Sequence, residues 1–241
     1  MKKQAQITFI LLISIFIVII AALIFYVANY YKNKNLIEPL VFEKSSIQNY
    51  IDSCVKKTAE EGLILLGKQG SLVLDDSLKV KDIEIYYYFK NGNRVPSIEN
   101  LQGQLSNYVK NNINVCLRGF EDFKKQGWDV EQGSFDAKTQ INEKDVNFDV
   151  DFPLKISDKG STINFEKFAS KLNVRLKYIY DLANKVVDFS SKYKRQVDLS
   201  ALNGYDVNVT VIDYEDSLIY NIADSNSMIM SRPYVFRFVV K

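Results

Sequence analysis

The segment from Ile7 to Val27 constrains this chain most, because it is almost wholly apolar. At ~1.5 Å per residue, a helix of this length spans roughly 30 Å, the thickness of the hydrocarbon core of a bilayer. A helix of that length in a soluble domain needs a polar face, and no charged residue lies between Gln4 and Tyr31. We therefore predict a membrane anchor over residues 1–31, with the span at about 7–27.

A cleaved secretory signal is the main alternative to an uncleaved anchor. Such a signal has a shorter apolar region of ~7–15 residues, followed by small residues at the cleavage site. Here the candidate cleavage site near Ala28 has the bulky Tyr26 two residues before it, which disfavours cleavage. Tyr26, Tyr30 and Tyr31 instead fit the aromatic belt that marks a membrane surface.

The basic residues that flank the span favour an N-terminus in the cytoplasm. Lys2, Lys3 and the α-amino group precede the span, whereas only Lys32 and Lys34 follow it closely, and the more basic flank stays in the cytoplasm. We therefore expect a single-pass protein of the cell membrane with its C-terminal domain outside. Without Lys2 and Lys3 the chain has 29 basic and 29 acidic residues, a balance that argues against nucleic acid as a partner.

After a short stalk at 32–44, the residue pattern predicts an α+β ectodomain over 45–241, with about three helices and antiparallel β-sheet. Apolar residues at helical spacing predict helices over 45–70, 96–127 and 175–193. Alternating residues and turn signals predict strands at 71–74, 82–89, 128–132, 136–141, 146–152, 154–156, 163–168, 207–211, 218–222 and 234–240. Helices and strands alternate only in the N-terminal part of the domain, which disfavours a doubly wound parallel sheet. A division into two subdomains near residue 158 is a further interpretation.

The two cysteines lie on the inward faces of the first two predicted helices. Cys54 belongs to the first helix and Cys116 to the second. In an oxidising compartment we expect them to form a disulfide that joins the helices, and closing a loop of about 60 residues stabilises a fold by ~4 kcal/mol. The alternative is two buried free thiols that pack as small hydrophobic side chains. The disulfide prediction depends on the outward orientation of the domain.

The chain contains no histidine, which excludes His-based acid–base catalysis, Ser-His and Cys-His nucleophiles, and His metal ligation. Two cysteines cannot form a zinc site by themselves. No P-loop, GxGxxG, HExxH, GxSxG or CxxC motif is present, so we name no catalytic residue, no cofactor and no metal site. Three acidic groups are interpreted as solvated turn residues rather than Ca²⁺ ligands: Asp75-Asp76, Asp213/Glu215/Asp216 and Asp224.

Two other features bear on the surface of the domain. Asn208-Val209-Thr210 is an N-glycosylation sequon, so Asn208 is a candidate for modification on an outward domain. Tyr86 and Tyr88 share one face of the strand predicted at 82–89. This strand is interpreted as half-buried, and an aromatic platform for a sugar or peptide is the alternative.

The N-terminal residues Lys2-Lys3-Gln4-Ala5-Gln6-Ile7-Thr8-Phe9, followed by an unbroken apolar helix, resemble archaeal pilin-type leaders. In such proteins a short basic leader is removed, and the apolar helix packs into a filament core or stays in the membrane. The order of this leader, the segments YIDSCVKKTAEEGLILLGKQG and PSIENLQGQLSNY, and the terminal RPYVFRFVVK is similar to uncharacterised single-span surface proteins of small-genome (DPANN-type) archaea. The second resemblance implies a membrane-anchored exterior domain.

Three functions are weighed on these grounds. The first is a non-enzymatic cell-surface protein that acts in adhesion, envelope architecture or recognition of a protein or surface polymer. The second is a pilin-like filament subunit, which would lose its leader. The third is an envelope hydrolase that uses two carboxylates, because glycosidases need no histidine. We predict the first, and the sequence names neither the partner nor the oligomeric state.

Overall fold

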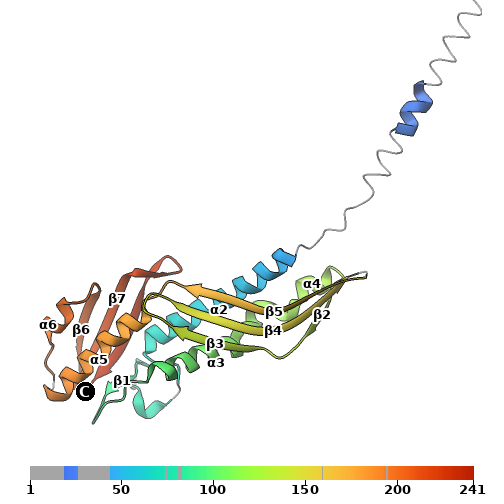
Figure 1. Ribbon diagram of the computed structural model, residues 1–241. Helices are drawn as coiled ribbons and strands as arrows, with labels where there is room; N and C mark the ends of the chain where they lie inside the picture. Colours follow the sequence, from blue (N-terminus) through green and yellow to red (C-terminus); the bar gives the residue numbers. More distant parts are fainter. Residues whose placement is uncertain (1–18, 27–43, 74, 81–82, 159, 194) are drawn as a thin grey trace, which may run out of the picture. The chain divides into compact units, whose positions relative to one another are not determined.

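The computed structural model describes residues 19–26, 44–73, 75–80, 83–158, 160–193 and 195–241 (Figure 1). The leader, most of the membrane span predicted at 7–27 and most of the stalk predicted at 32–44 lie outside the described residues. Residues 19–26 are helical. Among the residues that the structure describes, no helix is both long and apolar enough to cross a membrane. The chain divides into two units, Met1–Ser45 and Ser46–Lys241.

The second unit has an α+β fold with mostly antiparallel sheets, which confirms the predicted fold class in this coarse form. Its helices are α2 (Lys44–Gln69), α3 (Ile98–Leu117), α4 (Glu121–Lys125), α5 (Leu176–Lys192) and α6 (Leu199–Asn203). Its strands are β1 (Tyr87–Phe89), β2 (Asp129–Gln132), β3 (Asp136–Ile141), β4 (Val146–Asp158), β5 (Ser161–Leu172), β6 (Asn208–Tyr214), β7 (Ser217–Ile229) and β8 (Arg232–Val240). Two short 3₁₀ helices, η1 (Asp76–Leu78) and η2 (Arg118–Phe120), complete it.

The first sheet is a meander of long strands around β4. β5 pairs along one edge of β4, while β2 and β3 pair end to end along the other edge. The sequence predicted two separate strands at 146–152 and 154–156, but they are one strand that continues through Pro153. Pro153 has no N–H to donate, and it lies at an irregularity in the pairing with β5, between Asp151 and Leu154. Its carbonyl accepts a hydrogen bond from the Gly133 N–H at 2.7 Å.

Helix side chains satisfy backbone groups on both edges of this sheet. On the β3 edge, the Ser106 hydroxyl of α3 accepts the Thr139 N–H at 2.9 Å. On the β5 edge, the Asp52 carboxylate of α2 accepts the Ala169 N–H at 3.1 Å. An uncovered edge strand is a template for unwanted pairing with other chains, so these contacts protect the sheet as well as attach the helices.

The second sheet has the strand order β1-β8-β7-β6, with β1 parallel to β8 and the other pairs antiparallel. Helix α5 contacts β1 and β8, and aromatic rings fill the core of this part, with Tyr88 and Tyr220 both stacked on Phe238. The strands predicted at 207–211, 218–222 and 234–240 are confirmed as parts of β6, β7 and β8. Because β8 ends at Val240 between β1 and β7, the end of the chain is tied into the sheet as predicted.

Three predictions for the front half are wrong in detail. Of the strand predicted at 82–89, the described residues 83–89 form a strand only at β1, and residues 71–73 form no strand. The single helix predicted at 96–127 is interrupted after α3, because Arg118, Gly119 and Phe120 all have positive φ of 47–60°. This turn places Phe120 and Phe123 against Tyr50 of α2, with ring centroids 6.4 and 5.2 Å away. The break therefore serves the packing of aromatic rings between the helices.

The C-terminal part of α2 covers the edge of β8 beyond the short strand β1. Gly67 and Gly70 make this close approach feasible, because a Cβ at Gly67 would collide with the carbonyl oxygen of Val235, and one at Gly70 would lie 2.6 Å from that of Arg237. Gly70 also ends the helix with φ 78°, a left-handed conformation that favours glycine. Helix and strand thus meet with no side chain between their backbones.

Gly67→Ala is expected to lower the free energy of unfolding by about 1–3 kcal/mol, because the added methyl group pushes α2 away from β8. In an ordinary helix the same change stabilises by up to about 1 kcal/mol. Gly103→Ala in α3 is the matched control, since no atom lies within 4 Å of its Cβ position, and we expect it to stabilise. Urea denaturation of the two variants measures the difference. Equal stabilisation by both would show that α2 does not pack tightly on β8.

Candidate functional site

The predicted cysteine pair is present as a disulfide. Cys54 of α2 and Cys116 of α3 are bonded, with their Cα atoms 5.5 Å apart. Cys54 is buried and Cys116 is half-buried, so the bond lies at the interface of the two helices. It closes a loop across a sequence separation of 62 residues. The disulfide therefore has a structural role: it fastens α2 to α3.

The other predicted surface residues lie at separate places. Asn208 is exposed and begins the edge strand β6. Asp213 forms an exposed ion pair with Arg195 at 2.7 Å, and Asp216 pairs with Lys241. In the described part of the chain, no group of three or more His, Cys, Asp or Glu side chains is arranged to hold a metal ion.

Tyr86 and Tyr88 do not form an exposed aromatic platform. Tyr86 is buried, and its hydroxyl accepts the Asp75 N–H at 2.8 Å. Tyr88 is also buried, and its hydroxyl donates to the Gly70 carbonyl at 2.8 Å. The alternative interpretation of these two rings as a sugar or peptide platform is therefore wrong.

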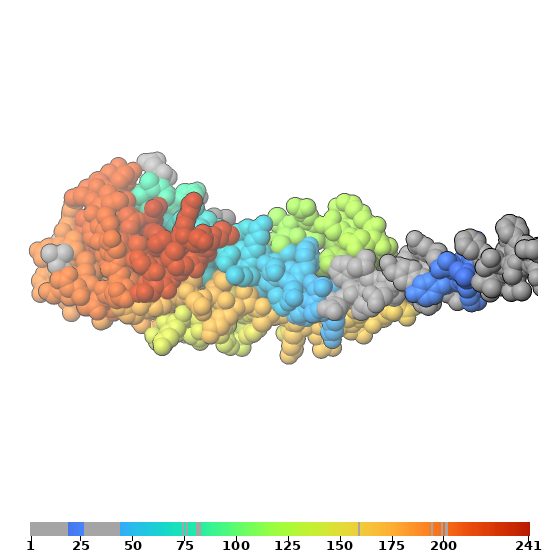
Figure 2. All heavy atoms as spheres, turned by 90° about the horizontal axis from the view of Figure 1, so that it is seen from above, coloured from blue at the N-terminus to red at the C-terminus, as the bar shows by residue number. Residues whose placement is uncertain are grey.

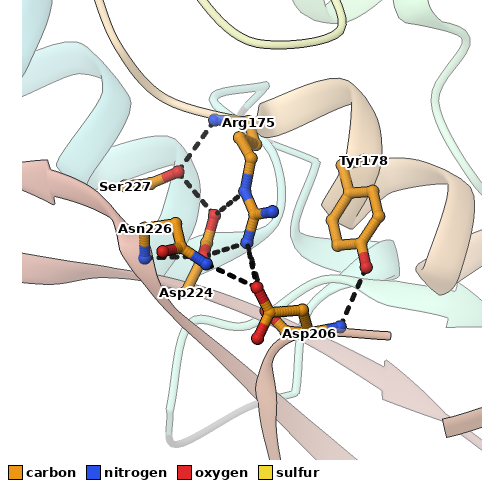
Figure 3. A network of polar contacts seen from close by, with 6 residues as sticks. All are labelled: Arg175, Tyr178, Asp206, Asp224, Asn226 and Ser227. Atoms are coloured by element: carbon orange, nitrogen blue, oxygen red, sulfur yellow. Dashed lines mark hydrogen bonds and ion pairs between the residues drawn. The ribbon is translucent and has the colours of Figure 1, made fainter. Parts of the chain in front are cut away.

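Asp224 was interpreted as a solvated turn residue, and this interpretation is wrong. Its side chain is fully buried in β7 and accepts hydrogen bonds from Nε and Nη2 of Arg175, at 2.9 and 2.5 Å (Figure 3). The hydroxyl of Ser227, also buried, donates to Asp224 and accepts the Arg175 N–H at 2.9 Å. Because Arg175 directly precedes α5, the cluster fastens that helix to the irregular part of β7.

The Asp206 side of this cluster is exposed to solvent, but its polar groups already contact one another. Asp206, whose side chain is 80% exposed, accepts a hydrogen bond from the Asn226 amide at 2.6 Å and lies 3.9 Å from Arg175 (Figure 3). A glycosidase needs two carboxylates that face one substrate space, whereas the Arg175 guanidinium contacts both Asp224 and Asp206. We therefore interpret the cluster as a structural network.

Opposing effects act on the pKa of Asp224. Burial acts to raise it, but hydrogen bonds from Arg175, Ser227 and the Asn226 N–H lower it, and the pKa lies below its usual value. The hydrogen bond to Asp224 in turn raises the pKa of Arg175. Both groups are thus charged at neutral pH, as a buried pair requires.

The candidate functional site is a groove of about 540 Å³ between α2 and the β7–β8 hairpin, which we call the α2–β8 groove. Its apolar lining comprises Ile64, Ile229, Met230, Pro233, Tyr234 and Val235, and its basic lining comprises Lys68, Arg232 and Arg237. In Figure 2 the C-terminal strands, in red, border the surface of α2, in cyan. The volume is within the range of ~300–1,000 Å³ that ligand pockets occupy.

The hairpin that forms one wall of the groove has an unusual turn. Ile229 pairs with Arg232, so Met230 and Ser231 alone connect the strands, with φ of 49° and 62°. Asn and Gly are the residues that favour positive φ in two-residue hairpin turns. A methionine there is strained, and the Met230 side chain is 50% exposed. Strain that local packing does not explain is often found at functional sites.

The charges around the groove are of one sign. Lys68, Arg232 and Arg237 are all exposed, and none of them forms an ion pair with a carboxylate in the residues described. No described Asp or Glu lines the groove. The surface therefore combines an apolar interior with an unneutralised basic rim.

One residue of the groove lining, Tyr234, has a buried hydroxyl group that lowers the stability of the fold. The Tyr234 ring lies beside Gly67 of α2, and its hydroxyl is buried without a hydrogen-bond partner among the described residues. Burial raises the pKa of this hydroxyl well above its usual value, so the group is neutral. An unsatisfied buried hydroxyl costs about 1–3 kcal/mol.

The chain matches no family model, no curated protein and no solved structure. The groove and the Arg175–Asp224 pair are therefore identified from the geometry of this structure alone. Neither was predicted from the sequence. One signal was available for Asp224, since it continues the inward alternation of Leu218, Tyr220 and Ile222, and a carboxylate at an inward position implies a buried partner.

Proposed function

We propose that the chain is a membrane-anchored, extracytoplasmic protein that recognises a partner at the α2–β8 groove and catalyses no reaction. The α2–β8 groove is the observation that carries the recognition part of this proposal. It brings together, on one concave surface, apolar side chains and three cations that form no ion pair with the described residues. Apolar pockets with a few convergent polar groups are the usual binding sites of proteins.

Two further features support the location outside the cytoplasm. The Cys54–Cys116 disulfide joins two helices of the domain, and such bonds persist in oxidising compartments. The apolar segment at 7–27 has the length and the lack of charge that a membrane span requires. Together they favour a domain held at the outer surface of a membrane.

The location is tested with the full chain expressed in cells. We expect the protein to remain in the membrane fraction after alkaline carbonate washing, and protease added to intact spheroplasts to digest the domain. We also expect Cys54 and Cys116 to react with a thiol reagent only after reduction. Recovery of the chain in the soluble fraction, or full protection from the added protease, would contradict the proposal.

A pair of variants isolates the role of the span. Ile15→Arg with Val18→Arg introduces two charges near its centre, each of which costs about 2.5–3.5 kcal/mol on insertion scales, and we expect the chain to leave the membrane fraction. Ile15→Leu with Val18→Leu keeps the same positions apolar and should leave the distribution unchanged. The intact mass of the extracted protein decides whether residues 1–5 are removed, which would favour the pilin-like alternative.

A further inference from the structure

We propose that the α2–β8 groove binds an acidic peptide segment of a partner protein that inserts one bulky apolar side chain between α2 and β8. This inference rests on the proposed recognition function, because it names the chemical class of the partner. The occupant must satisfy three properties of the groove: its charge, its apolar interior and its concave shape.

The charge of the groove favours an anionic occupant. Lys68 approaches from α2, whereas Arg232 and Arg237 approach from β8, so the three cations surround the groove from two elements. No described carboxylate of this chain neutralises them. Complementary charges across an interface speed association and exclude partners of the wrong sign. Aspartate and glutamate side chains on the occupant fit this rim.

The interior of the groove requires an apolar group as well. Ile64 and Val235 supply aliphatic surface from the two walls, and Met230 lies at the hairpin tip. Methionine is flexible and polarizable, so it adapts to ligand side chains of varied shape. An ion or a fully polar ligand would leave this apolar surface unused, whereas a leucine or phenylalanine side chain would cover it.

The strained turn indicates that a methionine is retained at position 230 because its side chain takes part in binding. Asparagine or glycine at this position would relieve the positive φ of 49°, but either would remove the half-exposed apolar side chain. Active and binding sites commonly retain residues that lower stability. Stability and affinity should therefore respond to a change at Met230 in opposite directions.

The concave shape favours a peptide over an anionic membrane surface. The groove is bounded by a helix on one side and a hairpin on the other, so a narrow protruding chain can enter it. A flat layer of lipid headgroups would not reach the lining between the two walls. We therefore choose a peptide, and binding to lipid becomes an outcome of the test.

The test uses the full chain in nanodiscs of phosphatidylcholine and a fluorescein-labelled peptide of aspartates and glutamates around one phenylalanine. Fluorescence anisotropy should show saturable binding that weakens with added salt. Two companion peptides, one with alanine for the phenylalanine and one with lysines for the acids, should bind at least about tenfold more weakly. Equal binding of all three peptides, or no binding of the first, would overturn the proposal.

Variants of the chain locate the binding. Arg232→Glu with Arg237→Glu should weaken the affinity at least about tenfold. The control, Lys57→Glu with Lys138→Glu, makes the same change in net charge at exposed positions that do not line the groove, and should change the affinity less than about twofold. If the control weakens binding as much as the groove variant, binding follows net charge and the proposal fails.

Two further measurements test the role of Met230 and the choice of a peptide over lipid. Met230→Asn should raise the melting temperature by about 2–4 °C while it weakens peptide binding several-fold, and a loss of both would show that Met230 serves the fold. Flotation of the nanodisc-held chain with vesicles that contain phosphatidylglycerol, compared with vesicles of phosphatidylcholine alone, tests the lipid alternative, because the nanodisc keeps the anchor out of the vesicles. Vesicle binding that disappears in the Arg232→Glu, Arg237→Glu variant, without peptide binding, would assign the groove to lipid and overturn the proposal. The protease test of topology is independent of these results.

Discussion

Replacement of Asp224 by alanine is expected to lower the free energy of unfolding by about 3–5 kcal/mol. Asp224 is fully buried, and its carboxylate is held by Arg175 and Ser227. Removing it leaves the guanidinium of Arg175, whose side chain is only 21% exposed, without its main counter-charge. The loss exceeds the value of the ion pair itself, because a poorly solvated charge is left unpaired.

Matched variants distinguish this mechanism from a loss of packing. Asp206→Ala removes an exposed carboxylate of the same network and should cost less than about 1 kcal/mol. The double variant Arg175→Met, Asp224→Leu replaces both charges by apolar groups, and we expect it to be more stable than Asp224→Ala alone. Urea denaturation of the three variants in detergent gives the free energies. A double variant that is less stable than the single variant would contradict the unpaired-charge mechanism.

The same pair predicts how stability depends on pH. The pKa of Asp224 in the folded state lies below its usual value, so its stabilising contribution is fully present above the unfolded pKa of ~3.9 and is lost as pH falls through the folded pKa. Wild type should therefore lose stability in acid more steeply than Asp224→Asn. With no histidine in the chain, we expect little change between about pH 5.5 and 7.5.

Removal of the disulfide is the second large effect. Cys54→Ala with Cys116→Ala should lower the free energy of unfolding by about 4 kcal/mol, because the open chain regains the entropy of a loop that spans a separation of 62 residues. Urea denaturation with and without a reductant measures the change. The reductant should destabilise wild type by a similar amount.

The double alanine variant is also the control for the reductant. It has no disulfide, so its unfolding midpoint should be the same with and without reducing agent. A wild-type midpoint that does not respond to the reductant, under conditions in which the free thiols are detected, would show that helix packing alone holds α2 against α3. Gly103→Ala, which lies in α3 away from other atoms, should leave the response to the reductant unchanged, as a control for a small change in α3.

The sequence predicted the local features of the domain well, because they depend on neighbours along the chain. Runs of a few residues are enough to show three of these features: the alternation in β6, β7 and β8, the apolar face of α5, and the inward position of Cys54. The predictions were wrong at the bounds of two elements, β4 and α3. Pro153 did not divide β4, because its missing donor lies at an irregularity of the pairing. The helix after Ser97 ended at Leu117, before Arg118, Gly119 and Phe120 with positive φ, although the helical spacing of apolar residues continues past them.

The sequence by itself predicted the α+β class, the apolar segment at 7–27 as a candidate anchor, and Cys54 and Cys116 as a candidate disulfide. Tertiary structure alone decided the candidate site and the buried network. Arg175 and Asp224 are 49 residues apart, and the groove joins Ile64 of α2 to Met230 and Arg237 at the far end of the chain. Periodicity reports which face of an element turns inward, but it carries no information on which distant element that face meets. The approach of α2 to β8 at Gly67, and with it the groove, exists only once both elements have folded against each other.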